Sequence, residues 1–269
     1  MVLPVHDINP TRRTPVATYL LIAANVVVFL LSPVAGHIVG TTPLQQECRQ
    51  VAFFDRYAAK PDELVHNRQD PIAATGAVGR SGGQVGCVAQ HPPPYGKVPF
   101  LSVFYAMFLH GGWLHLLGNM LFLYVFGNNV EDRLGRLRYL LFYVFCGYAA
   151  TYGFALFQPA SDQPLVGASG AIAGVLGAYL VLYPRARVWS LLTFLFFLPV
   201  RLPAWLVLGS WFLLQYVYFR GAGVAHSSGV AYGAHVIGFV VGALLVWPLR
   251  GTATPTTGSA ARWGPYAPR

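Results

Sequence analysis

A serine and a histidine in two separate apolar segments have the side chains that nucleophilic catalysis requires. Ser169 stands within Gly167-Ala168-Ser169-Gly170, and His235 lies in a later segment. A serine hydroxyl is a weak nucleophile until a base within hydrogen-bond reach takes its proton, and neutral histidine is the usual base. The pair could therefore perform acyl transfer, with Ser169 as nucleophile and His235 as general base.

A third segment could supply the hydrogen-bond donors that a tetrahedral intermediate needs for its oxyanion. His115 and Asn119 are four residues apart, so they would share one face of a helix. The backbone amides around Gly167 and Ala168 would also be unpaired if a helix begins near Ser169. These four residues are the candidates for oxyanion and substrate stabilisation.

The elements that must position these side chains are six apolar runs. Hydrophobic residues make up 55% of the 269 and charged residues 10%, against roughly 25% charged in an ordinary soluble domain. Alone or with flanking residues, each run is long enough to cross a bilayer. The sequence therefore predicts an all-α membrane protein with six transmembrane helices. The runs are 16–31, 114–126, 137–157, 165–183, 202–219 and 230–249.

The net charge of +9 indicates topology rather than a nucleic-acid partner. Eleven of the 18 basic residues flank the runs on one side, and the short loops on the other side hold only Arg220. The other six lie in the long segment 33–98, where charge has little influence on orientation. An excess of lysine and arginine marks cytoplasmic loops. We therefore expect both termini in the cytoplasm of a multi-pass protein of the cell (inner) membrane.

The chain divides into three parts by composition. Residues 1–15 are expected to form a short cytoplasmic arm, and 16–250 the membrane domain. That domain includes a long, irregular extracytoplasmic loop at about 36–98. The tail 251–269 is rich in Thr, Pro and Gly and is expected to be disordered. The first run resembles a signal peptide, but its length favours an uncleaved anchor.

The three cysteines fall in two environments. Cys146 lies inside an apolar run and is expected to pack as a small apolar side chain. Cys48 and Cys87 lie in the extracytoplasmic loop, where a disulfide could form. The sequence does not determine their separation, so the bridged and free forms both stay open.

Depth in the membrane argues that the polar residues form one site. Alone, each has a structural explanation, since small residues pack helices and a membrane serine can bond its own backbone. With the amino terminus inside, however, Ser169, His115 and His235 all fall within about two turns of the outer start of their spans. Independent packing residues would have no reason to share a depth. Gly238 and Gly242, on the face of His235, would let that helix approach the one with Ser169.

All nine acidic residues fall outside the six apolar runs, in segments expected to be loops or termini. A proton relay or cation pathway would require a carboxylate within a span, so a channel or transporter is disfavoured. The absence of an internal repeat disfavours it further. No acid is placed to orient His235, and only Asp162 could reach its neighbourhood.

Residues from about 108 to 247 resemble the rhomboid family of intramembrane serine proteases. The resemblance implies a six-helix bundle, a Ser169–His235 dyad, no cofactor, and hydrolysis of peptide bonds in or near the transmembrane helices of membrane-protein substrates. It also implies substrate entry past the fifth span, with the loop 220–232 as a cap. The motifs that carry it are His115-x-x-x-Asn119, Glu131-Asp132-Arg133-Leu134-Gly135, Gly167-Ala168-Ser169-Gly170 and Ala234-His235-x-x-Gly238-x-x-x-Gly242.

The chain departs from the family pattern at two places, and two alternative functions also stay open. The first outer loop is long and has no Trp-Arg pair, and Ala173 stands where the family usually has an aromatic that stacks on the catalytic histidine. A catalytically inactive rhomboid-like protein that binds membrane clients is one alternative. A metal site made of His110, His115 and His235 is the other, although no HExxH is present to provide a base. The sequence names neither the natural substrate nor the oligomeric state.

Overall fold

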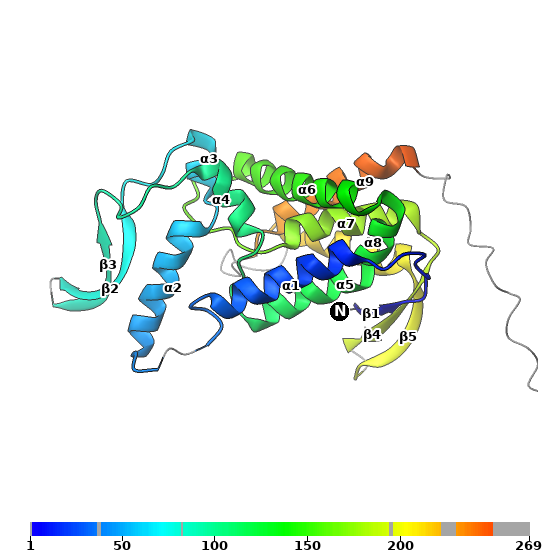
Figure 1. Ribbon diagram of the computed structural model, residues 1–269, viewed down its shortest axis with the longest axis horizontal. Helices are drawn as coiled ribbons and strands as arrows, with labels where there is room; N and C mark the ends of the chain where they lie inside the picture. Colours follow the sequence, from blue (N-terminus) through cyan, green and yellow to red (C-terminus); the bar gives the residue numbers. More distant parts are fainter. Residues whose placement is uncertain (1, 37–38, 82, 194–195, 222–229, 250–269) are drawn as a thin grey trace, which may run out of the picture.

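The computed structural model describes residues 2–36, 39–81, 83–193, 196–221 and 230–249 (Figure 1). The tail 251–269 and most of the predicted cap 220–232 lie outside these residues. Every predicted apolar run overlaps a helix, and the short 3₁₀ helix Trp247–Leu249 extends the last one. The helix at 114–126 continues to Leu134, so Glu131 and Asp132 lie in a helix rather than in the predicted loop. These helices are α1 (Val16–Leu31), α5 (Trp113–Leu134), α6 (Arg136–Phe157), α7 (Ser169–Leu182), α8 (Ala204–Phe219) and α9 (Tyr232–Val246).

Helix α7 is the centre of the bundle. Its residues from Ala171 to Tyr179 are all buried, and it contacts α5, α6, α8 and α9. The prediction of a helical run over 165–183 was too long, because α7 begins only at Ser169. At 1.5 Å per residue its 14 residues span about 21 Å, less than the ~30 Å of a bilayer core.

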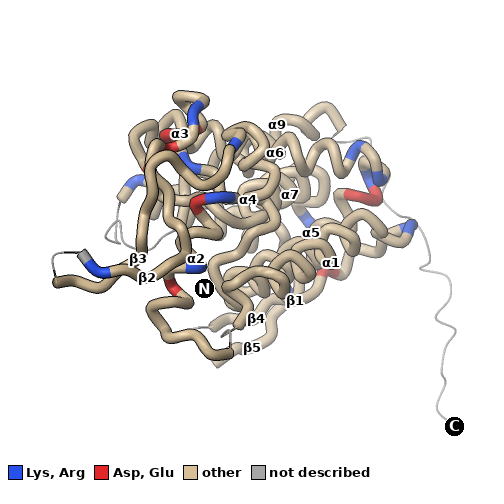
Figure 2. Tube along the Cα trace, turned by 60° about the vertical axis from the view of Figure 1, so that its left-hand side comes forward, with Lys and Arg blue, Asp and Glu red and all other residues tan. Residues whose placement is uncertain are grey.

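Two helices in the described part of the chain are long and apolar enough, by length and composition, to cross a membrane. They are Arg136–Phe157 and Tyr232–Leu249. Val16–Leu31, Ser169–Leu182 and Ala204–Phe219 are apolar but shorter. Figure 2 shows that charged residues gather mainly toward two opposite sides of the molecule, with few of them between.

Glycines bring α7 and α9 into backbone contact, as the sequence predicts. A Cβ atom on Gly242 would lie 2.0 Å from the carbonyl oxygen of Gly174, and one on Gly238 would lie 2.2 Å from that of Gly170. Real Cβ atoms do not approach backbone oxygens so closely, so any side chain at either position would separate the helices. This contact holds the start of α9 against the start of α7.

The amino-terminal arm predicted at 1–15 contains a strand. The strand β1 (Val2–Asp7) pairs antiparallel with β4 (Arg187–Leu192), which pairs antiparallel with β5 (Leu198–Pro203). The resulting sheet has the order β1-β4-β5. It lies beside the bundle near the end where α1 begins (Figure 1).

The loop at 36–98 is folded, so the prediction that it is irregular was wrong. It contains α2 (Pro43–Tyr57), α3 (Pro61–His66) and a hairpin of β2 (Ala73–Ser81) and β3 (Gln84–Gln90), and a disulfide between Cys48 and Cys87 joins α2 to β3. We call residues 39–98 the insert. Helix α4 (Pro99–Ala106) follows it and leads to α5.

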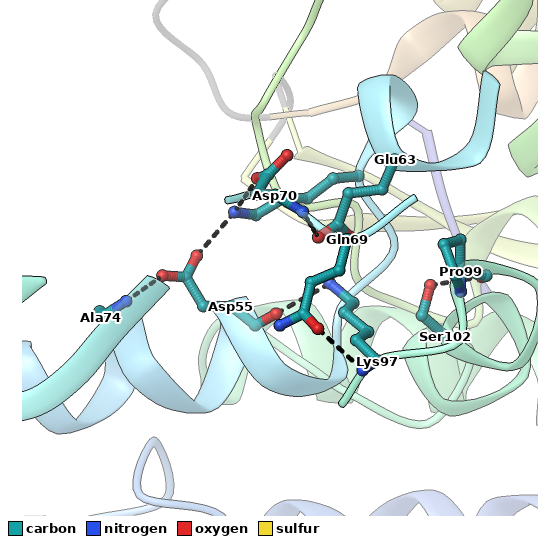
Figure 3. Close-up of polar contacts among 9 residues, drawn as sticks. Asp55, Glu63, Gln69, Asp70, Ala74, Lys97, Pro99 and Ser102 are labelled. Atoms are coloured by element: carbon teal, nitrogen blue, oxygen red, sulfur yellow. Dashed lines mark hydrogen bonds and ion pairs between the residues drawn. The ribbon is translucent and has the colours of Figure 1, made fainter. Parts of the chain in front are cut away.

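Buried ion pairs stabilise the insert (Figure 3). The Nζ atom of Lys60 lies 2.8 Å from a carboxylate oxygen of both Asp55 and Asp70. Burial disfavours the charge on Lys60, but these two partners outweigh burial and raise its pKa. The Nζ atom of Lys97 lies 2.6 Å from Oε2 of Glu63, and both side chains are almost fully buried. Burial dominates there and lowers the pKa of Lys97, against the opposing effect of Glu63.

Glu63→Gln is expected to lower the free energy of unfolding by about 3 kcal/mol, because a buried Lys97 loses its carboxylate. The double variant Glu63→Gln/Lys97→Met should lose less free energy of unfolding than the sum of the losses in the two single variants. Thermal unfolding of the detergent-purified chain measures both. The exposed Arg80→Gln serves as the control and should change stability by less than about 0.5 kcal/mol. Additive losses in the double variant would show that the pair is not coupled.

Candidate active site

Ser169 and His235 are in hydrogen-bond contact. Ser169 is the first residue of α7, and His235 lies in the first turn of α9. The Nε2 atom of His235 is 2.8 Å from the Oγ atom of Ser169. The structure thus brings together the predicted nucleophile and the predicted base; their catalytic roles stay predictions.

The other ring nitrogen of His235 has a partner that sequence reasoning missed. The Nδ1 atom lies 2.7 Å from Oε1 of Gln215, a buried residue of α8. Because an amide oxygen only accepts, this contact favours the tautomer with its proton on Nδ1. Nε2 is then free to accept the proton of Ser169. A signal was present, since Gln215 is the one amide side chain in the run 202–219, and polar groups at membrane depth are functional candidates.

Aromatic rings support His235 from a different place than the family pattern predicts. Ala173 is fully buried and has no ring to offer. Trp211 of α8 lies against the imidazole instead, with ring centroids 5.9 Å apart, and Tyr232 of α9 approaches edge-on at 6.3 Å. The imidazole therefore has contacts from α8 as well as from its own helix.

His115 and Asn119 pack against the backbone that precedes Ser169. A Cβ atom on Gly167 would lie 2.7 Å from Nε2 of His115 and 3.5 Å from Nδ2 of Asn119. Gly167 also has a φ of +117°, which favours glycine. Nδ2 of Asn119 lies 3.0 Å from Nε2 of the buried His110, so one amide hydrogen bonds His110 and the second can point elsewhere.

The three-histidine metal site is not formed. His110 and His115 are neighbours, with ring centroids 5.1 Å apart. However, nowhere in the described ranges do three His, Cys, Asp or Glu side chains come together as a possible metal site. Instead, His110 forms a hydrogen bond with Asn119, which the sequence did not predict.

The loop between α6 and α7 is held from both sides. Leu165 exchanges two backbone hydrogen bonds with Ala59 of the insert, of 2.7 and 3.3 Å, and the amide of Gly167 donates to the carbonyl of Ala106 at 2.9 Å. The insert and α4 therefore position the strand-like segment that leads to Ser169. Asp162, the one acid predicted to reach the neighbourhood of His235, does not line the cavity at Ser169 and His235.

A cavity of about 590 Å³ opens at Ser169 and His235. The first-turn amides of α7 have no partner within the helix, and no side chain caps this end. A carbonyl next to Ser169 could therefore receive hydrogen bonds from those amides and from the side chains on α5. Residues that line the cavity include Met107, Trp113, His115, Asn119, Thr151, Gly167, Ser169, Gly170, Ala231 and His235.

The free cysteine follows the prediction for Cys146, which is fully buried and packs against Gly174 of α7. A Cβ atom on Gly174 would lie 2.6 Å from the Sγ atom of Cys146. This side of α7 therefore packs against α6. In the first turn of α7, Ser169 and Gly170 line the cavity.

Known proteins resemble this chain in the region that builds the site. A family model described as the Rhomboid domain matches residues 99–252. Rhomboid-like protein 11, chloroplastic, of Arabidopsis thaliana is 34% identical over 54% of this chain and 50% of its own length, and Rhomboid protein 1, mitochondrial, of Saccharomyces cerevisiae is 33% identical over 55% and 41%. The Putative rhomboid protease YdcA of Bacillus subtilis is 42% identical over 27% and 36%. The chain thus spans half or less of these relatives. Because the matched domain covers more than half of the chain and every helix of the site, the chain belongs to the rhomboid family.

Proposed function

We propose that the chain is an intramembrane serine endopeptidase that hydrolyses peptide bonds in or near the transmembrane helices of membrane-protein substrates. Rhomboid proteins are helical proteins of the membrane, and the relative YdcA is named a putative protease. The observation that carries the proposal is the 2.8 Å contact between Oγ of Ser169 and Nε2 of His235. It lies at the wall of a cavity large enough for an extended peptide segment.

In this proposal Nε2 of His235 takes the proton of Ser169 while Oγ forms a bond to the scissile carbonyl carbon. The oxyanion receives hydrogen bonds from the first-turn amides of α7 and from His115 and Asn119. His235 then gives the proton to the leaving amine, and a water molecule attacks the acyl-enzyme in the same way. Gln215 holds the imidazole during both steps.

The proposal includes six membrane spans, with α1 and α5 to α9 crossing the bilayer and both termini in the cytoplasm. The gathering of charge toward two opposite sides of the molecule supports this arrangement (Figure 2). Helix α7 is shorter than the hydrocarbon core, so its first residue would lie below the outer surface. Ser169 would then meet substrate within the depth of the membrane.

Reconstitution in liposomes with a panel of single-span substrates tests the proposed function. The wild-type chain is expected to cut at least one substrate, and Ser169→Ala to cut none. Ser210→Ala on α8 is the matched control, because its hydroxyl bonds the carbonyl of Val207 away from the cavity. Equal product from Ser169→Ala would contradict the mechanism. Stable capture of substrates without cleavage by the wild type would favour the inactive, client-binding alternative.

Asn119→Ala is expected to lower turnover by about 10²-fold, because the oxyanion would lose one of several donors. Initial cleavage rates in liposomes measure this loss. Asn128→Ala, near the other end of α5, is the matched control and should leave the rate unchanged, since Asn128 bonds its neighbour Asn129. An unaltered rate in Asn119→Ala would exclude this side chain from the site.

A further inference from the structure

The β4–β5 hairpin ends in large apolar side chains that the described part of the chain leaves uncovered. Phe196 is 100% exposed, Phe197 58% and Leu198 50%. Phe196 and Phe197 have φ values of 52° and 62°, a conformation that bulky residues rarely adopt. Backbone strain of this kind tends to occur at functional positions, and the described part of the chain provides no cover for these side chains.

The base of the same hairpin is aromatic and basic. The guanidinium of Arg201 lies 4.4 Å from the ring centroid of Trp189 on the paired strand. Arg185 and Arg187 are exposed beside this pair, and residues 183–203 contain no acid. Tryptophan and arginine are the residues that gather at membrane–water interfaces, and basic residues there attract anionic headgroups.

The base of the hairpin adjoins the start of a helix that the proposed arrangement places in the bilayer. Helix α8 starts at Ala204, directly after β5, and its first turn exposes Trp205 and Leu206. The hairpin lies on the flank of the bundle in Figures 1 and 2 and projects away from the helices. A bilayer that surrounds the start of α8 would therefore also lie against the hairpin.

We infer that the β4–β5 hairpin is a membrane anchor, whose tip side chains enter an anionic lipid leaflet beside the start of α8. The depth is limited by the backbone, because unpaired strand edges cannot enter the hydrocarbon region. The strands therefore lie at headgroup level, with Trp189 and Arg201 in the interface. Among the described residues of the hairpin, Phe196, Phe197 and Leu198 reach the acyl chains.

Charge and position favour lipid over a protein partner. The three exposed arginines at the base of the hairpin complement a phosphate-rich surface. The hairpin also has basic residues at its base and aromatic rings at its tip. In a bilayer the basic residues would meet the lipid headgroups and the rings would meet the acyl chains. A second copy of this chain would have to offer an acidic and apolar surface in the same geometry.

Depth-resolved fluorescence quenching tests the anchor. An environment-sensitive fluorescent amino acid replaces Phe196 in the full-length chain, held as one molecule per lipid nanodisc with phosphatidylglycerol. Lipids with a nitroxide near the headgroup end of the acyl chain should quench this probe more strongly than aqueous iodide does. The same probe at Gln84, exposed on the β2–β3 hairpin, should show the reverse order.

Three results would overturn the inference. Iodide quenching at position 196 equal to that at position 84 would place the tip in water. Protection from both quenchers would mean that protein covers it. Because the fluorescent residue could disturb the turn, the same measurement is made at Phe197. Aqueous quenching at position 197, in a variant with unchanged thermal stability, would also exclude the anchor.

Discussion

Replacing both Ser169 and His235 by alanine is expected to slow peptide cleavage no more than replacing Ser169 alone. The two side chains share one hydrogen bond of 2.8 Å, and neither can activate the reaction without the other. Each single change should cost on the order of 10⁴-fold or more, and the double change the same, as groups that act as a unit do. Initial rates of substrate cleavage in liposomes measure all three variants.

Independent action would give a different pattern. If Ser169 and His235 contributed separately, the two losses would multiply, and the double variant would be slower than either single variant by a further factor of about 10⁴. A matched pair away from the cavity, Ser210→Ala with the exposed His66→Ala, should leave the rate near that of the wild type. Multiplicative losses at Ser169 and His235 would contradict the dyad.

The helices of the site could be predicted because their signals are local. The run 16–31 coincides with α1 (Val16–Leu31), since an apolar stretch without breakers needs no distant partner to define it. The glycines of α9 also predicted its contact with α7, because small residues are the condition for close helix approach. Local composition therefore placed the nucleophile next to the base.

The sheet and the insert could not be predicted in the same way. Val2 pairs with Leu192, a partner 190 residues away, and strand pairing of this kind leaves no local signature. In the insert the low apolar content favoured an irregular loop. The capping box of Thr42 and Gln45 at the start of α2 was the local signal that was overlooked. Ion pairs and a disulfide stabilise the insert in place of a large apolar core.

The support of His235 was missed because only acidic residues were considered as its partner. A neutral amide can also hold an imidazole, since one oxygen acceptor at Nδ1 is enough to select the tautomer. Burial makes an amide the less costly choice at this position, because a carboxylate there would have to be desolvated. Gln215 thus belongs to the site through its contact with His235 rather than through contact with substrate.

Gln215→Leu is expected to lower turnover by about 10³-fold. Leucine fills a similar volume but accepts no hydrogen bond, so the N–H at Nδ1 of His235 loses its partner and the reactive tautomer loses its preference. A wrong tautomer costs about 10⁴-fold where a carboxylate orients the base, and a neutral amide, which adds no charge stabilisation, should contribute less. Cleavage rates and the rate at which a fluorophosphonate labels Ser169 both measure the loss.

Gln215→Glu separates positioning from packing. Glutamate keeps an oxygen acceptor within reach of Nδ1, so a positioning role predicts a rate within about tenfold of the wild type. If Gln215 only filled space, Gln215→Glu would cleave more slowly than Gln215→Leu. A buried carboxylate in an apolar helix interface is more destabilising than a leucine. Equal thermal stability of the two variants, measured in detergent, assigns any rate difference to His235. A slower Glu variant than Leu variant would therefore remove Gln215 from the mechanism.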